Sequence, residues 1–348
     1  MVAPTICVTP ADIRKGRVLA WRLWEAKTER PTYEVVIPSH ARPNDLCLST
    51  LTFLRKHGVD LSRVHVFVDF AWSSACGTRA YDLYVKSLRQ HGFHAVHVRP
   101  GGRGLEGNMK AIRALFDIGT YVITMSDRVD DLLELTAGTS KKPTLTSVPA
   151  GALASLWHHG HDVIKAGGFA AWSTNASHSA RTMRQDALSR KAGLLDGNMT
   201  GQLVTQDWKD MTVDHGLIYD VEYAACLWTL GHGYVRYRML CCKHPYRSRG
   251  GQAERYSDPA ARRQTEDAAI KSVAAKYPDV LMFVSKPNAS LKVMNYAFRR
   301  HGPSVLKVIQ RHGQGAGRNR KYSNDRAATP QERTAACRAR QKRKRKRT

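Results

Sequence analysis

Four short apolar runs between Tyr33 and Met125 constrain the fold of this chain more than any other feature. Each is rich in β-branched and aromatic residues, and each begins about 30 residues after the one before it. Strands are expected at Tyr33–Pro38, Val64–Asp69, His94–Val98 and Tyr121–Met125. The segments between them have the composition of helices and run over Asn44–His57, Cys76–His91 and Gly107–Asp117. This alternation predicts an α/β fold, in which helices flank a mostly parallel, Rossmann-like sheet.

In such sheets, ligands bind outside the carboxyl ends of the strands. The predicted strand ends are polar, charged or glycine-rich and comprise Ser39 to Arg42, Asp69, Gly101 to Gly104, and Ser126 to Arg128. No GxxxxGK[ST] phosphate loop is present, and no GxGxxG follows the first strand. The pattern therefore predicts a nucleotide site but argues against P-loop hydrolysis and standard dinucleotide binding.

The second half of the sequence is less periodic. A strand is expected at Gly233–Cys242, and helices are expected at Glu222–Leu230, Ala260–Ala275 and Pro303–Arg311. The stretch Trp157–Gly201 is rich in Gly, Asn, Trp and His, which predicts loops around a site. The His158-His159-x-His161 segment is expected to lie in one of these loops. We expect an N-terminal extension (1–30), one domain (31–312) and a disordered basic tail (313–348).

The chain is strongly cationic, with 55 Lys+Arg, 29 Asp+Glu and a net charge of +26. The segment Arg318–Thr348 carries thirteen Lys/Arg and two acids, which leaves a net of +15 for Met1–Gly317. This distribution predicts a polyanionic partner such as nucleic acid, although a solubilising tail or a localisation signal is an alternative for 318–348. The 42% hydrophobic content supports a folded core, and no run of about 18 apolar residues predicts a membrane span. Met1–Arg17 lacks the apolar region of a signal peptide, so a cytoplasmic location is expected.

Cysteine usage fits an intracellular protein. There are seven cysteines, an odd number, and no CxxC occurs. A disulfide framework or a zinc ribbon is therefore not expected, even though Cys241 and Cys242 lie close to His244.

The order of the motifs resembles that of GT-A glycosyltransferases. The motifs are IPSHARP (Ile37–Pro43) after the first strand, Asp69 after the second, a Gly-rich loop leading to Asn108, Ser126–Asp131 after the fourth strand, Asp220-Val221-Glu222, His244-Pro245 and Gly250–Gln252. More narrowly, the chain resembles the TET-associated glycosyltransferases of bacteriophages, DNA glycosyltransferases related to the base J glucosyltransferase. The resemblance covers roughly Tyr33 to Tyr256.

The resemblance implies a nucleotide-diphosphate sugar as donor. The residues expected around the donor are Pro38, Ser39, His40, Arg42, Asp69, Gly104, Asn108, Asp127 and Gly251. Arg42 would pair with the diphosphate, since a guanidinium offers two parallel donors to phosphate oxygens. Asp69 would accept from the base or the ribose, and Gly251 would lie in a flap over the donor.

GT-A enzymes usually carry Asp-x-Asp where this chain has Ser126-Asp127-Arg128. Two explanations follow from the resemblance. Asp127 and His244 hold Mg²⁺ or Mn²⁺, or Arg128 supplies the positive charge on the leaving diphosphate in place of a metal. A donor site that has lost its activity is a third.

For the catalytic base, the resemblance points to Asp220, with Glu222 as the alternative. A capping function in the first helical turn is the simpler interpretation of both acids.

The expected activity is transfer of a sugar to the hydroxymethyl group of a 5-hydroxymethylpyrimidine in DNA, with a functional link to a TET-like dioxygenase that supplies this group. Trp157, Trp172 and Trp208 are candidates to stack the acceptor base, while core packing is the simpler interpretation. The alternatives are a GT-A enzyme acting on a glycan or a protein, and a non-catalytic nucleic-acid-binding protein on a degenerate transferase fold.

Overall fold

The computed structural model describes residues 31–69, 79–136, 144–177, 179–180, 182–184, 188–244, 258–284 and 296–298. The chain divides into two compact units, Met1–Ile309 and Gln310–Thr348. The second unit, which holds most of the predicted basic tail, lies outside the described residues, as do the predicted helix Pro303–Arg311 and the Gly250–Gln252 flap. All of the described residues belong to the first unit.

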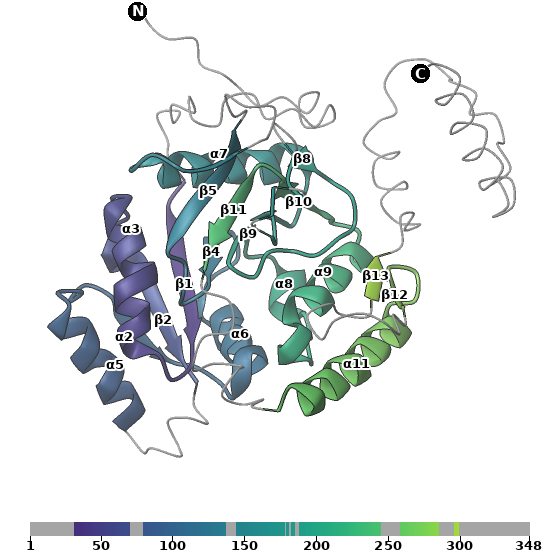
Figure 1. Cartoon of the computed structure of the whole chain (residues 1–348), viewed down its shortest axis with the longest axis horizontal. Coiled ribbons are helices and arrows are strands. Elements are labelled where there is room, and N and C mark those ends of the chain that lie inside the picture. Colours follow the sequence, from purple (N-terminus) through teal and green to yellow (C-terminus); the bar gives the residue numbers. More distant parts are fainter. Residues whose placement is uncertain are drawn as a thin grey trace, which may run out of the picture. The chain divides into compact units, whose positions relative to one another are not determined.

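A central eight-stranded sheet organises this unit, in the order β3-β2-β1-β4-β9-β7-β10-β8 (Figure 1). Its strands are β1 (Tyr33–Ser39), β2 (Val64–Val68), β3 (His97–Pro100), β4 (Tyr121–Met125), β7 (Ala171–Thr174), β8 (Leu188–Ser189), β9 (Met199–Leu203) and β10 (Tyr234–Tyr237). Only β9 and β8 run opposite to the other six strands. The predicted α/β class with a mostly parallel sheet is confirmed.

Helices cover both faces of the sheet. On one face pack α2 (Pro43–Leu46), the π-helical turn η2 (Cys47–Leu51), α3 (Thr52–Lys56), α5 (Arg79–Gln90) and α7 (Ala152–Gly167). On the other face pack α6 (Gly104–Leu115), α8 (Gln206–Asp210), the 3₁₀ turn η4 (Gly216–Ile218), α9 (Tyr219–Thr229) and α11 (Pro259–Lys276). A further 3₁₀ turn, η3 (Leu61–Arg63), precedes β2. Within the described residues, no helix has the length and apolar character to cross a bilayer.

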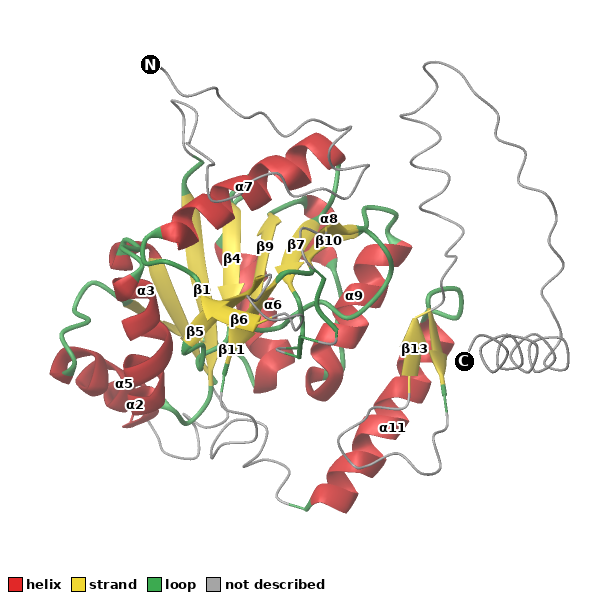
Figure 2. Cartoon of the chain, turned by 45° about the horizontal axis from the view of Figure 1, so that its top comes forward, coloured by secondary structure: helices red, strands yellow, loops and turns green. Residues whose placement is uncertain are grey.

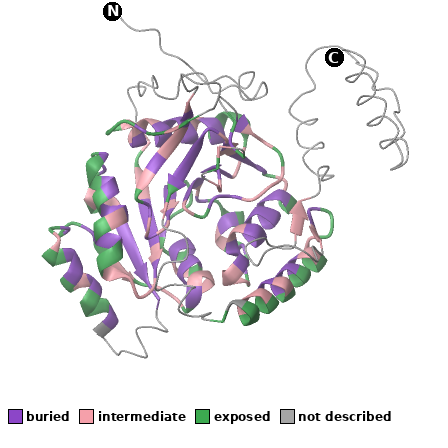
Figure 3. Cartoon of the chain, viewed as in Figure 1, coloured by how far each residue is buried: buried purple, intermediate pink, exposed green. Residues whose placement is uncertain are grey.

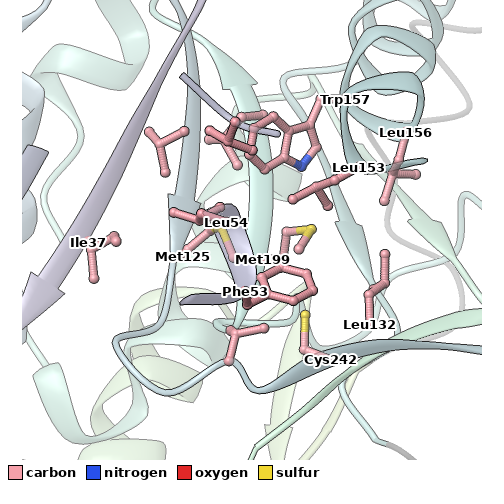
Figure 4. Close-up of a cluster of buried hydrophobic side chains, with 14 of the residues drawn as sticks. Ile37, Phe53, Leu54, Met125, Leu132, Leu153, Leu156, Trp157, Met199 and Cys242 are labelled. Atoms are coloured by element: carbon pink, nitrogen blue, oxygen red, sulfur yellow. The ribbon is translucent and has the colours of Figure 1, made fainter. Parts of the chain in front are cut away.

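The two faces have separate apolar cores, because side chains alternate along each strand. Val35 and Ile37 of β1 join the cluster under α3 and α7, whereas Val36 joins the cluster under α6 and α9. Figure 4 shows Trp157 of α7 and Phe53 of α3 gathered with other side chains of the first cluster. The strands between the helices are largely buried, and the outer side of α11 is exposed (Figure 3).

Two smaller sheets complete the described fold (Figure 2). One has the order β11-β5-β6, with β5 (Asp131–Thr136), β6 (Thr144–Ser147) and β11 (Leu240–Lys243); the other pairs β12 (Leu281–Phe283) with β13 (Tyr296–Phe298). The strand predicted over Gly233–Cys242 is thus two strands in different sheets, β10 and β11. A turn at Arg238-Met239 separates them, and the apolar character of both parts hid that break from the sequence pattern.

The prediction of loops over Trp157–Gly201 is right for 190–198, which lie outside helices and strands, but wrong for the parts that form α7, β7, β8 and β9. Helix α7 is buried on so many sides that its sequence lacks a polar stripe. Its histidines pack within the core, where His159 Nδ1 lies 2.6 Å from the Tyr237 hydroxyl. The base-stacking hypothesis for the tryptophans is also not supported, since Trp157, Trp172 and Trp208 are at most 3% exposed.

Candidate functional site

The segment after β1 makes a strained turn. Ala41 has a φ of +55°, and it is the only non-glycine residue with positive φ in the described part of the chain. Such a conformation is unfavourable for an alanine and persists where surrounding contacts impose it. Pro43 then opens α2, and the Arg42 amide donates to the Tyr84 hydroxyl of α5 at 3.1 Å. The turn fixes where the Arg42 side chain starts.

Ser39, Arg42 and Asp127 meet at the carboxyl ends of β1 and β4. The Ser39 hydroxyl donates to Asp127 Oδ2 at 2.8 Å, and Arg42 Nη1 donates to Oδ1 at 3.2 Å. Ser39 Oγ also lies 2.6 Å from the Tyr84 hydroxyl. Burial raises the pKa of Asp127, and the nearby Arg42 charge opposes that shift. Both oxygens of the carboxylate are therefore already engaged.

Asp69 follows β2 and joins the IPSHARP turn to α6. Its Oδ2 accepts from the Gly104 amide at 2.9 Å and lies 3.1 Å from His40 Nδ1. Gly104 has a φ of +73°, which suits glycine and lets its amide face the carboxylate. Asn108, in the same helix, donates from Nδ2 to the Phe67 carbonyl at 3.2 Å. Its Oδ1 is buried and has no hydrogen-bond partner within the described residues, which leaves an acceptor at this edge unused.

The π-helical turn η2 holds the Ser126-Asp127-Arg128 segment in place, which the sequence pattern did not reveal. Thr50 Oγ1 donates to the Ser126 carbonyl at 2.9 Å and accepts from the Val129 amide at 2.8 Å. Thr50 is fully buried, so both backbone groups depend on it. Val129, the residue after Arg128, is fully buried in the core. A run of Leu, Ser and Thr in a helical pattern gives no signal for such a clamp.

Arg128 lies beside Asp127 and is half-buried. Its positive charge opposes the burial-induced rise in the pKa of Asp127. Its Nη1 is buried and has no hydrogen-bond partner among the residues that the structure describes. Of the other predicted donor residues, Pro38 lies within β1 opposite Phe67, and Gly251 lies outside the described residues.

A second cluster centres on Asp196, which sequence reasoning missed. Asp196 is buried and accepts hydrogen bonds from the Thr174 hydroxyl and from the Asn198 amide (3.1 Å) and side chain (2.6 Å). Burial raises its pKa, and the charge of His244 opposes this shift. The Asn198 carbonyl accepts from the Ser126 amide at 3.1 Å, which places this cluster next to the first. An acid just before a strand within an apparent loop was the only indication in the sequence.

Asp220 stands in the first turn of α9 next to Asp196. A methyl group on Gly197 would lie 2.4 Å from Asp220 Oδ1, so the carboxylate packs directly on this glycine. Asp220 is half-buried and makes no hydrogen bond with its side chain within the described part of the chain. Burial, together with the neighbouring Asp196 charge, raises the pKa of Asp220 to about 7. It is thus a carboxylate that changes protonation near neutral pH.

Glu222, two residues further on, has a different environment. It is fully buried, and its Oε2 accepts from the amides of Asp214 (3.0 Å) and His215 (2.9 Å). Its Oε1 pairs with Lys276 Nζ of α11 at 3.1 Å. Residues i and i+2 of a helix do not share a face. Glu222 therefore ties α9 to its neighbours, while Asp220 stays available.

The described residues do not fit a metal held by Asp127 and His244. The Asp127 oxygens are bound by Ser39 and Arg42, and the His244 charge acts on Asp196. Within the described ranges, no group of three or more His, Cys, Asp or Glu is arranged to hold a metal ion. Arg42 and Arg128 place positive charge near Asp127.

No protein-family model and no curated protein matches the chain. Among solved structures, it is similar to the mannosyltransferase PcManGT from Pyrobaculum calidifontis in complex with GDP-Man and Mn²⁺. The similarity has 12% sequence identity and a TM-score of 0.44, and it covers 72% of this chain and 69% of that chain.

Proposed function

We propose that this chain is a nucleotide-sugar-dependent glycosyltransferase, a hexosyltransferase with Asp220 as its catalytic base. The carrying observation is that a carboxylate with a pKa of about 7 and no side-chain hydrogen bond within the described residues stands beside the edge where Ser39, Arg42 and Asp69 gather. A general base works best when its pKa is close to the working pH.

The first cluster suits a nucleotide-diphosphate donor. Asp69, which follows β2, is an acceptor for the hydroxyl or N–H groups of a nucleoside. Arg42 and Arg128 supply two guanidinium groups for the diphosphate, and Asp127 orients Arg42. Planar guanidinium donors match phosphate oxygens well. In this proposal the arginines balance the charge that develops on the leaving diphosphate.

The chemical step uses Asp220 alone as a proton acceptor. A new bond forms between the acceptor oxygen and the anomeric carbon, while the bond from that carbon to the diphosphate breaks and its electron pair leaves with the diphosphate. The proton of the acceptor hydroxyl passes to an Asp220 carboxylate oxygen. Glu222, bound to two backbone amides and Lys276, positions the helix that carries Asp220.

For the acceptor, we propose the hydroxymethyl group of a 5-hydroxymethylpyrimidine in DNA. The support is the motif resemblance together with the +26 charge, of which +15 lies in Met1–Gly317. A TET-like dioxygenase would then supply the acceptor hydroxyl. Transfer to a glycan or protein, or DNA binding without catalysis, are the alternatives.

One assay tests the proposal. The full-length chain is incubated with duplexes containing 5-hydroxymethylcytosine or 5-hydroxymethyluracil and with a panel of UDP- and GDP-sugars, with and without Mn²⁺. The DNA is then digested to nucleosides, whose masses are measured by mass spectrometry. A nucleoside heavier by one hexose supports the proposal, and Asp220→Asn should form this product far more slowly. No mass change with any donor, alongside tight DNA binding, would support the non-catalytic alternative.

A further inference from the structure

Two arginines stand at the end of β10 and in the turn after it. Arg236 belongs to β10, Arg238 lies two residues further on in the turn that follows the strand, and the charge of Arg238 acts on Arg236. Arg236 Nη2 donates to the Ser189 hydroxyl at 3.3 Å and to the Lys191 carbonyl at 3.0 Å. Arg238 Nη2 donates to the Thr182 carbonyl. All of these partners are neutral.

The positive charges of these two arginines are not balanced by a neighbouring carboxylate within the described residues. Neither Arg236 nor Arg238 forms an ion pair with a carboxylate in the described part of the chain, and both are half-buried. Burial lowers the pKa of Arg236, and the charge of Arg238 lowers it further. Burial also lowers the pKa of Arg238, and there the charge of Arg184 adds to the shift. Each Nε is buried and has no hydrogen-bond partner among the described residues. An anion bound by these guanidinium groups would relieve the repulsion between their charges.

This arginine pair lies beside the proposed base. Tyr296 of β13 has a pKa raised to about 12 by burial, and the charges of both Asp220 and Arg236 act on its phenol. A methyl group on Gly193 would lie 2.6 Å from Arg236 Nη2, just as Gly197 packs on Asp220. The segment 193–197 therefore passes under both side chains. β10 also runs parallel to β7, whose last residue, Thr174, hydrogen-bonds Asp196.

We propose that Arg236 and Arg238 form a phosphate subsite that holds the backbone of the DNA acceptor next to Asp220. This inference rests on the proposed function and names the part of the acceptor that this side of the site recognises. Guanidinium groups bind phosphate oxygens through paired donors, and phosphate contacts fix the register of a nucleic acid on a protein. The donor diphosphate has its own arginines, Arg42 and Arg128, at the ends of β1 and β4.

DNA is the phosphate source that the rest of the chain favours. Met1–Gly317 keeps a net charge of +15, which extends the attraction beyond one phosphate group. A small phosphorylated acceptor would need only the local pair, and a lipid headgroup would require an apolar surface beside it. Arg238 is instead flanked along the chain by the buried Tyr237 and Met239.

The test measures binding of the full-length chain to a fluorescein-labelled 20-base-pair duplex by anisotropy at several KCl concentrations. The variants are R236Q/R238Q and, to keep the charge while removing the planar fork, R236K/R238K. The matched control is K86Q/R89Q, which removes the same charge from the surface of α5. Thermal melting identifies any variant that has lost its fold, in which case the single variant R238Q replaces the double variant.

Each lost phosphate contact lowers the slope of log affinity against log salt by about 0.9, so R236Q/R238Q should flatten the slope by about 2 units and bind about tenfold more weakly at moderate salt. R236K/R238K should keep most of the slope, and the control should change both quantities much less. An equal effect in the control, or an unchanged slope in R236Q/R238Q, overturns the proposal. Competition supplies a second criterion. The proposal is also overturned if inorganic phosphate or phosphatidylserine vesicles displace the duplex from the wild type but not from R236Q/R238Q, while unlabelled DNA competes equally with both proteins.

The outcome is separable from that of the proposed function, because binding requires no sugar transfer. If the salt dependence of DNA binding depends on these arginines but no sugar is ever transferred, the phosphate subsite is supported and the proposed transferase activity is rejected. Sugar transfer to DNA with a normal KM for the duplex in R236Q/R238Q supports the enzyme and removes the subsite.

Discussion

Arg42 and Asp127 form an ion pair, with 3.2 Å between Nη1 and Oδ1, that joins the segments following β1 and β4. Asp127 is the only acid in the Ser126-Asp127-Arg128 segment, and its carboxylate faces this guanidinium and the Ser39 hydroxyl. The pair is largely buried, so its geometry matters more than that of a surface ion pair. Asp127 thus serves to hold a cationic side chain next to the proposed diphosphate position.

This pairing predicts that sugar transfer is insensitive to chelation. In a mass-spectrometric transfer assay, EDTA should leave the rate unchanged, because Arg42 and Arg128 already supply positive charge. Arg128→Gln should lower kcat by on the order of 10²-fold, the usual cost of losing one group that stabilises transition-state charge. Complete loss of wild-type activity in EDTA, restored by Mn²⁺, would contradict this prediction.

The protonation of Asp220 predicts how the rate depends on pH. With a pKa of about 7, the carboxylate is mainly protonated at pH 6 and mainly ionised at pH 8. The rate should therefore rise through pH 7 and then level off. Asp220→Asn should reduce kcat by on the order of 10²–10⁴-fold and abolish this rise. A retained rise in Asp220→Asn would assign the titration to another group.

The same pKa predicts a pH-dependent change in stability. An unfolded aspartate has a pKa of about 3.9, so the raised folded value destabilises the protein progressively as the pH rises from about 4 through 7. Asp220→Asn should therefore be more stable than the wild type by on the order of 2 kcal/mol at pH 8, with the gain shrinking towards pH 4. Denaturant unfolding at both pH values measures it. Asp117→Asn, at an exposed position, is the control and should show no such trend.

The two hydrogen bonds of the Thr50 hydroxyl predict that Thr50→Val lowers the stability of the protein and that Thr50→Ser does not. Valine has the same shape but leaves the Ser126 carbonyl and the Val129 amide without their partner. The loss of stability should be on the order of 2 kcal/mol, the cost of unsatisfied buried polar groups. In the transfer assay, Thr50→Val should also raise the donor KM, whereas Thr50→Ser should retain both properties. Equal values for the two variants would refute the clamp.

The contacts of Glu222 predict a mainly structural effect. Glu222→Gln removes the charge that pairs with Lys276 but keeps an oxygen for the two amides, so stability should fall by on the order of 1–3 kcal/mol. At a temperature where the variant is folded, the pH profile should remain that of the wild type. A profile that loses its rise in Glu222→Gln, but not in Asp220→Asn, would make Glu222 the base.

The first half of the fold was predictable because each element has a strong local pattern. β4 matches its predicted range, and β1 and β2 differ by one residue at one end. β3 begins three residues late, because His94 and Ala95 lie in a turn although their sequence fits a strand. α6 begins three residues early, since the positive φ of Gly104 and the Asp69 contact start the helix inside the glycine-rich loop.

Site residues that directly follow a strand were predictable from the sequence. Those whose position depends on contacts with distant parts of the chain were not. Ser39, Arg42 and Asp127 meet because parallel strands end at one edge. Asp196 and Thr50 depend on neighbours distant in the sequence, such as Thr174 and Val129, and no local pattern encodes those neighbours. The burial of Glu222 likewise depends on Lys276, which lies 54 residues further along the chain.

The order of the site along the chain has a consequence for how its specificity can change. Contacts of the proposed donor side come from residues 39–129, and those of the proposed acceptor side come from residues 174–238. The Ser126–Asn198 hydrogen bond is a junction between the two blocks. Each side of the proposed site is therefore built from its own stretch of the sequence, although β4 and β9 join the two stretches in one sheet. Substitutions in the second block can therefore alter the proposed acceptor contacts while the proposed donor contacts stay as they are.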